Sequence, residues 1–254
     1  AVVRHPMPYG DLAKEAVQRF EKFSDFEKHK VTIEEREEYE SYVERGIVVF
    51  AGVDYGKILR QAEKEADIVI WDGGNNDFPF FKPNLQFVIA DPLRAGHEVS
   101  YYPGETNFRM ADVIVVNKVN SAKKSDVEKV VANAKKFNPK ALVVLANSVL
   151  RVSEPLKIKG KRVLVVEDGP TLTHGGMPFG AGFVAAKKFG AREIVDAKKS
   201  AVGSIREIYR KFPHLGRVLP AMGYSKKQVH ELEQTINNSS AQVVVSGTPI
   251  DLGR

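Results

Sequence analysis

The sequence predicts an α/β fold built on a mostly parallel, doubly wound sheet, and two observations lead to that prediction. First, most strand-like segments are continuous runs of β-branched residues or leucine, which is typical of strands covered on both faces. Second, helical patterns lie between many of these runs, as in a doubly wound sheet. Strands are expected at Ile47–Ala51, Ile68–Trp71, Phe87–Ala90, Val113–Val116, Leu142–Leu145, Val163–Val166, Glu193–Val195 and Val243–Ser246, and Val2–Val3 resembles the end of another.

Three helices are expected from apolar spacing and start signals. One carries Tyr55, Ile58, Leu59, Ala62 and Ala66 on one face. A second follows a capping box formed by Ser125 and Glu128 and ends before Pro139, and a third begins with Ser225 and Gln228. The region Phe23–Arg45 is highly charged without a clean apolar stripe, so we expect a surface helix or a mobile insertion there.

Composition narrows the class of protein. The chain has 254 residues, no cysteine and a formal net charge of +6, so disulfides and thiolate metal sites are excluded. No apolar run reaches the roughly 20 residues of a membrane helix, and we expect a cytoplasmic protein without a membrane partner. The absence of cysteine also fits a thermophile. Excess lysine indicates either a solvated surface or attraction to anionic ligands, whereas no familiar nucleic-acid module is present.

Two domains are expected. A polar stretch with proline and glycine at Glu154–Gly160 places the boundary, so that residues 1–157 form the first domain and 158–254 a smaller α/β domain. The chain also opens within an apparent strand, from which we expect that further sequence precedes Val2.

The first polar strand end is the stretch Asp72-Gly73-Gly74-Asn75-Asn76-Asp77, which follows the apolar run Ile68–Trp71. An aspartate at the end of a buried strand is a common Mg²⁺ ligand in nucleotide-dependent enzymes. Glycines after it allow backbone N–H groups to approach a phosphate. The alternative is a plain strand-to-turn transition.

Two further strand ends resemble a base-binding site. Asn117-Lys118-Val119-Asn120 matches the Asn-Lys-x-Asp motif that reads guanine in GTPases, except that Asn120 replaces the carboxylate. The next strand ends at Asn147 and Ser148, in the order expected for that arrangement. An amide at position 120 puts selectivity for guanine in doubt, and a polar turn before a helix is the alternative.

The fourth polar strand end starts a glycine-rich loop. Asp168 and Gly169 are followed by Thr171, Thr173 and His174, and the loop leads into a helix expected at about Phe183. Glycines before a helix N-terminus can bind an anion through backbone N–H groups. A structural role is the alternative for His174. No segment matches the phosphate-loop pattern Gly-x₄-Gly-Lys-Ser/Thr, and Gly56-Lys57 lacks its spacing.

Several motifs together resemble the archaeal cyclic 2,3-diphosphoglycerate synthetase family and its GTPase-like, P-loop NTPase relatives. They are VVRHPMPYGDL, EREEYE, WDGGNNDFPF, ADVIVVNKV and the long VLVVEDGPTLTHGGMPFGAGFVAAKKFGA. The resemblance covers nearly the whole chain. It implies a P-loop NTPase domain that begins just after its phosphate loop, without the N-terminal domain of the family. It also implies ATP-dependent closure of a phosphoanhydride within 2,3-diphosphoglycerate, with Mg²⁺ as cofactor.

The resemblance also implies roles for individual residues. Asp72 would bind the metal and, with Arg4 and His5, act at the reacting phosphate. The nucleotide would contact Gly73, Gly74, Asn75, Asn117, Lys118, Asn120 and Asn147. The anionic substrate would contact Asp168, Thr171, Thr173, His174, Gly175, Gly176, Gly180 and Gly182. ATP or GTP could be the nucleotide, the partner would be a phosphorylated small molecule, and the protein could form a homo-oligomer.

Two other functions remain open at this point. One is a regulatory or metallochaperone-type GTPase without a small-molecule substrate, although such a chaperone usually carries a cysteine or histidine cluster. The other is a non-catalytic interaction module. A second glycine-rich loop after residue 168 favours a substrate site over both.

Overall fold

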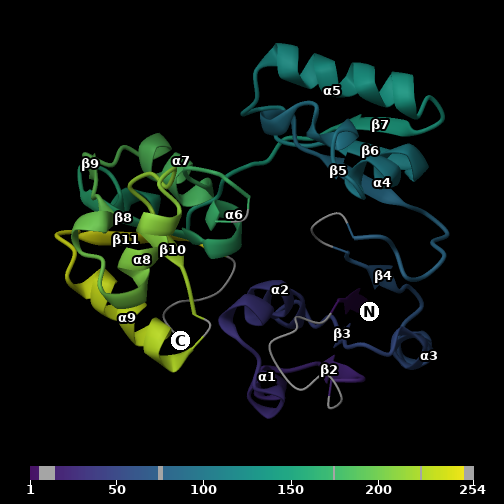
Figure 1. Cartoon of the computed structure of the whole chain (residues 1–254), viewed down its shortest axis with the longest axis horizontal. Coiled ribbons are helices and arrows are strands. Elements are labelled where there is room, and N and C mark those ends of the chain that lie inside the picture. The colour runs from purple at the N-terminus through teal and green to yellow at the C-terminus, as the bar shows by residue number, and fades with distance from the viewer. Residues whose placement is uncertain (6–14, 74–76, 174, 224, 249–254) are drawn as a thin grey trace. The chain divides into compact units, whose positions relative to one another are not determined.

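The computed structural model describes residues 1–5, 15–73, 77–173, 175–223 and 225–248 (Figure 1). It has an α/β fold with parallel strands, as the sequence predicted. The chain divides into two compact units, one of residues 1–6 and 51–149 and the other of residues 7–50 and 150–254. This division differs from a single cut after residue 157, because residues 7–50 group with the C-terminal half.

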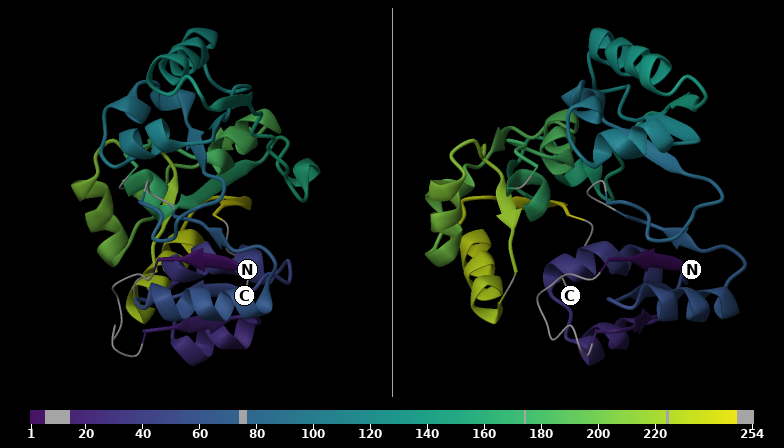
Figure 2. Two further views of the ribbon diagram at one scale, coloured as in Figure 1. Left: turned by 90° about the vertical axis from the view of Figure 1, so that its right-hand side faces the viewer. Right: turned by 45° about the vertical axis from the view of Figure 1, so that its right-hand side comes forward.

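The first unit contains two groups of parallel strands. Its elements are β1 (Val2–Arg4), α3 (Tyr55–Glu65), β4 (Ile70–Trp71), β5 (Phe87–Ala90), α4 (Gly104–Met110), β6 (Val113–Val116), α5 (Lys124–Phe137) and β7 (Leu142–Leu145). β1 pairs with β4, and a separate three-stranded sheet has the order β5-β6-β7. Side chains of α4 and α5 pack against one face of the three-stranded sheet, along which α5 lies in Figures 1 and 2.

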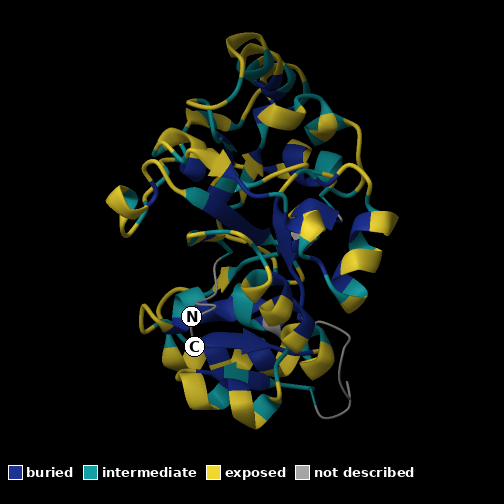
Figure 3. Cartoon of the chain, turned by 90° about the vertical axis from the view of Figure 1, so that its left-hand side faces the viewer, coloured by how far each residue is buried: buried dark blue, intermediate teal, exposed yellow. Residues whose placement is uncertain are grey.

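The second unit is built around β8 (Arg162–Asp168), whose central residues Val163–Val166 are all apolar and buried. β10 and β11 pair with β8 in parallel on either side, and β9 pairs with its first residues. Buried residues from β8, the flanking strands and the helices form its core, seen as dark blue segments in Figure 3. The remaining elements after residue 150 are α6 (Gly169–Thr173), α7 (Ala181–Lys188), β9 (Glu193–Ile194), α8 (Gly203–Lys211), β10 (Leu219–Ala221), α9 (Lys226–Asn237) and β11 (Val243–Gly247).

The charged region at Phe23–Arg45 forms two helices around buried aromatic residues. α1 (Phe23–His29) and α2 (Ile33–Val43) follow β2 (Gln18–Phe20), which neighbours β3 (Val49–Ala51) in a sheet. Phe20, Phe26 and Tyr39 are buried, and the rings of Phe20 and Tyr39 lie 4.9 Å apart. Large rings supply the apolar contact area here, so a regular stripe of aliphatic residues is unnecessary.

The observed bounds of the helices and strands show which of them local sequence patterns predicted correctly. Every expected strand is present within two residues of its expected bounds. Ser225 caps α9 as predicted and accepts a hydrogen bond from the N–H of Gln228 (3.2 Å). The capping box at Ser125 and Glu128 was wrong, because α5 begins at Lys124 after Lys123, which makes no side-chain cap. β2 and β10 were not expected, since each has three residues and contains a polar or proline residue.

Membrane-spanning segments were searched for along the part of the chain that the structure describes. None of its helices combines the length and the apolar character needed to cross a bilayer.

Candidate functional site

The tips of β1 and β4 bring together two segments that are far apart in the sequence. Val3 is the register partner of Trp71, so that Arg4 and Asp72 follow on adjacent parallel strands. Their side chains form an ion pair, with 2.5 Å between the Arg4 Nη1 and Asp72 Oδ2 atoms. Arg4 is buried, whereas about one third of the Asp72 side chain is exposed (34%). The structure therefore joins two of the predicted catalytic residues and leaves the carboxylate accessible to solvent.

A second pair lies beside the first. The Nδ1 atom of His5 is 3.1 Å from the Oδ2 atom of Asp77, at the far end of the acidic loop. Asn107, a buried residue of α4, donates a hydrogen bond from Nδ2 to the backbone oxygen of Asp77 (3.2 Å). Sequence reasoning missed both Asp77 and Asn107. In the sequence, each of the two residues stands among other polar residues. That is only a weak sign of a functional role, because which groups they contact depends on the fold.

Gly73 is needed where it stands because of the neighbouring tryptophan. A Cβ atom at this position would lie 2.8 Å from the Nε1 atom of Trp71, closer than packing allows. The indole packs against the rings of Tyr55, Phe80 and Phe81, which restrict its movement. Gly73 thus allows the chain to turn immediately after β4. The predicted nucleotide contacts Gly74 and Asn75 lie outside the described residues.

Within the Asn117–Asn120 segment, Lys118 adopts a backbone conformation that favours glycine. Lys118 has a φ of 56°, in the left-handed region, and its N–H donates to the Oδ1 atom of Asn117 (2.8 Å). The Lys118 ammonium reaches Asp91, with 2.8 Å between Nζ and Oδ2. Non-glycine residues in this region cost about 1–2 kcal/mol, and such strain is concentrated at functional sites.

Asp91, at the end of β5, is a further residue that sequence reasoning missed. Burial raises the pKa of this carboxyl group, but hydrogen bonding and charge attraction from Lys118, together with the N–H of Leu93, hold the pKa below its ordinary 3.8. Arg94 is a second cationic neighbour, 3.4 Å away. Asp91 is therefore a carboxylate at neutral pH and holds Lys118 in place.

Asn120 connects the ends of β6 and β7. Its Nδ2 atom donates to the backbone oxygen of Ser148 (3.0 Å), and its Oδ1 atom accepts from the Ser148 N–H (2.9 Å). The amide thus uses both of its polar atoms to hold the turn, while the neighbouring Asn147 is exposed. The structure brings the second and third predicted strand ends together, and both lie in a different sheet from Asp72.

The left-handed backbone at Lys118 leads to a stability prediction. Lys118→Gly and Lys118→Ala both lose the ion pair with Asp91, but only glycine removes the backbone strain. We expect the glycine variant to be more stable than the alanine variant by about 1 kcal/mol. Thermal unfolding of the two variants measures the difference, and an alanine variant of equal or greater stability would contradict the strain.

In the second unit, the glycine-rich loop binds an anion that belongs to the chain itself. The carboxylate of Glu167 accepts hydrogen bonds from the N–H groups of Gly180 (3.0 Å), Gly182 (3.2 Å) and Phe183 (2.7 Å). These groups lie at the N-terminus of α7, where a negative charge is favoured. Burial raises the pKa of Glu167, and the three N–H donors partly oppose that effect. In this structure, two of the predicted substrate contacts bind Glu167.

Other residues of the same loop stabilise its backbone. The hydroxyl of Thr171 donates to the Asp168 carboxylate, and the hydroxyl of Thr173 donates to the backbone oxygen of Gly169 (2.9 Å). A Cβ atom on Gly175 would lie 2.4 Å from the backbone oxygen of Thr171, and Gly176 has a φ of 65°. His174 lies outside the described residues.

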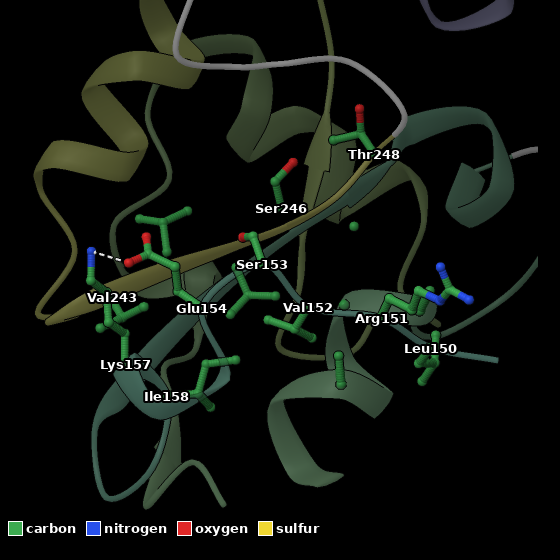
Figure 4. Close-up of a pocket in the computed structure, with 16 residues that line it drawn as sticks. Leu150, Arg151, Val152, Ser153, Glu154, Lys157, Ile158, Val243, Ser246 and Thr248 are labelled. Atoms are coloured by element: carbon green, nitrogen blue, oxygen red, sulfur yellow. Dashed lines mark ion pairs between the residues drawn. The ribbon is translucent and has the colours of Figure 1, made fainter. Parts of the chain in front are cut away.

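A cavity of about 680 Å³ lies beside α7 in this unit (Figure 4). It is lined by residues 150–154, 157 and 158, by Ala181, Gly182 and Ala185 of α7, and by the whole of β11 with Thr248. Its polar groups include Ser153 and Ser246, and Lys157 and Glu154 form an ion pair of 2.6 Å. The described residues contain no cluster of three or more histidine, aspartate or glutamate side chains that could bind a metal ion.

Comparison with known proteins gives one strong similarity. The chain is 65% identical, over 252 residues, to a protein of Thermococcus kodakarensis named arginine synthetase ArcE. The match covers 99% of this chain but only 56% of that relative, so the chain spans little more than half of its length. No family model matches the chain.

Proposed function

We propose that this chain forms part of a nucleotide-driven synthetase that makes arginine. The observation that carries the proposal is the 65% identity to the arginine synthetase of Thermococcus kodakarensis across almost the entire chain. Because the chain spans 56% of that relative, the remainder of the longer polypeptide would supply further parts of the active site. A phosphate loop is the part we expect there, since these 254 residues contain no such motif.

The chemistry of arginine suggests why a phosphoryl donor is needed. Its guanidino carbon carries three nitrogens, so synthesis from a ureido compound replaces the C–O bond with a C–N bond. ATP, when bound with Mg²⁺, supplies a phosphoryl group that makes the ureido oxygen a leaving group. Ammonia then forms the C–N bond, and inorganic phosphate departs with the oxygen.

The chain's own residues would bind and orient the reactants. Asp72, accessible beside Arg4, would hold Mg²⁺, which commonly uses one or two carboxylates and completes its shell with water and phosphate oxygens. Arg4 would attract the phosphate that transfers, because a guanidinium presents several donors to an oxyanion. Asn117, Lys118 and Asn147 would contact the base from the ends of β6 and β7, with Asn120 holding the turn. The reaction would take place in the cytoplasm.

The motif resemblance favours a second product, the cyclic phosphoanhydride of 2,3-diphosphoglycerate. Both reactions place a phosphoryl group on an oxygen of the substrate and then displace phosphate, so the same residues would serve either. Lys118 and Asp91 are compatible with either nucleotide, and ATP is our choice because Asn120 lacks the carboxylate that reads guanine.

Phosphate release by the full-length gene product tests these alternatives. ATP or GTP with Mg²⁺ would be combined with citrulline and ammonia, with 2,3-diphosphoglycerate, or with neither. We expect phosphate release that requires citrulline and ammonia and is accompanied by arginine. Release that depends on diphosphoglycerate would instead support the cyclic product, and equal release without any substrate would support a GTPase switch.

A further inference from the structure

Among the described residues, one face of the three-stranded sheet in the first unit is apolar and exposed along its two outer strands, β5 and β7, while Val113 of the central strand is buried. In the strand register, Phe87 lies beside Val113 and Leu142, and Ile89 lies beside Val115 and Val144. These residues point to the same side of the sheet because side chains alternate along a strand. We call four of them the uncovered face, with exposures of 59% for Phe87, 65% for Ile89, 64% for Leu142 and 39% for Val144.

The opposite face of the same sheet shows what a covered face looks like. Ala90, Ile114 and Val116 are buried there against residues of α4 and α5. Parallel strands occur almost only in sheets that are covered on both faces, and continuous apolar runs reflect this. The uncovered face is therefore a surface that a further segment is expected to bury.

The edge of the sheet indicates the shape of that segment. β5 is an end strand of its sheet, and β4, the preceding strand in the chain, is an end strand of another. Ile70 of β4 is 53% exposed, and Ile68, two residues before it, is 71% exposed. A strand added beside β5 would pair with a free edge, and a helix connected to it would cover the adjoining apolar face.

We propose that the uncovered face and the free edge of β5 bind a strand-and-helix segment of the longer polypeptide. The Thermococcus kodakarensis relative has such additional length, because this chain spans only 56% of it. A second copy of the chain fits less well, since contact between two uncovered faces would leave the β5 edge unpaired. This inference does not depend on which product the enzyme makes.

Site-directed labelling tests the proposal, because the chain has no cysteine. Ile89→Cys and Leu142→Cys place thiols on the uncovered face, and Lys135→Cys places one on the exposed side of α5. Each variant is treated with a maleimide alone and together with the part of the Thermococcus kodakarensis relative that this chain does not match. Mass spectrometry of the peptide carrying each introduced cysteine gives its labelling rate.

We expect the added polypeptide to slow labelling at positions 89 and 142 by at least about 10-fold and to leave position 135 unchanged. A chain with both Ile89→Lys and Leu142→Lys should fold, since both side chains are exposed, but should not bind the added polypeptide. Unchanged labelling, or failure of the unsubstituted chain to bind, would overturn the proposal. So would slow labelling of the chain alone, which would mean that its other unit or a second copy covers this face.

Discussion

Gly247→Ala is expected to destabilise the second unit by about 3 kcal/mol, because the added methyl group has no space. A Cβ atom at this position would lie 2.3 Å from the Oε2 atom of Glu167 and 2.7 Å from the backbone nitrogen of Gly182. Gly182 and Gly247 can approach each other this closely only without side chains. The methyl group would push the carboxylate away from the N–H groups at the start of α7, and chemical denaturation measures the loss.

Gly56→Ala is a matched control for that prediction. Gly56 lies near the start of α3, where the nearest atoms to a new Cβ would be 3.6 Å away. Alanine favours a helix over glycine by roughly 1 kcal/mol, so this variant should be as stable as the unsubstituted chain or more so. If Gly247→Ala behaved like Gly56→Ala, the close packing around Glu167 would be refuted.

The raised pKa of Glu167 makes its contribution depend on pH. Burial raises the pKa of this group above its ordinary 4.5, so the folded chain holds the proton more tightly than the unfolded chain. The stabilisation is therefore complete below pH 4.5 and is lost as the pH rises through the folded pKa. In Glu167→Gln, this part of the pH dependence of the unfolding free energy should disappear.

Asp72→Asn is expected to lower phosphate release by the full-length gene product at least about 100-fold, because the amide cannot neutralise a bound Mg²⁺. The substitution keeps the shape of the side chain but removes the charge opposite Arg4, which is buried. We expect it to destabilise the fold by about 2 kcal/mol as well, since the ion pair is only partly exposed.

Two measurements separate these effects. Nucleotide binding, followed as a function of Mg²⁺ concentration at a temperature where both forms are folded, should lose its dependence on Mg²⁺ in Asp72→Asn. Glu128→Gln removes a carboxylate from an exposed pair on α5, whose atoms are 3.8 Å apart, and should change neither binding nor phosphate release. An unchanged rate in Asp72→Asn would remove this residue from the metal site.

Patterns within the sequence determined most of the strands and the identity of the polar strand ends. Runs such as Val113–Val116 have to be buried, and the period of their apolar residues differs from that of the helices that follow. Asp72, Asn117 and Asp168 were recognised as candidate site residues because each stands at the end of an apolar strand, where ligands commonly bind in α/β sheets. These inferences depend on neighbours in the chain, which a sequence displays directly.

Only the tertiary structure decided what each polar residue contacts. Arg4 meets Asp72 across 67 residues of intervening chain through strand register, Asp77 meets His5, and Lys118 meets Asp91. The glycines expected to bind a ligand surround Glu167, because a carboxylate buried at the end of β8 must find donors and the N-terminus of α7 offers three. Such pairings arise between segments that are distant in sequence, so no local pattern encodes them.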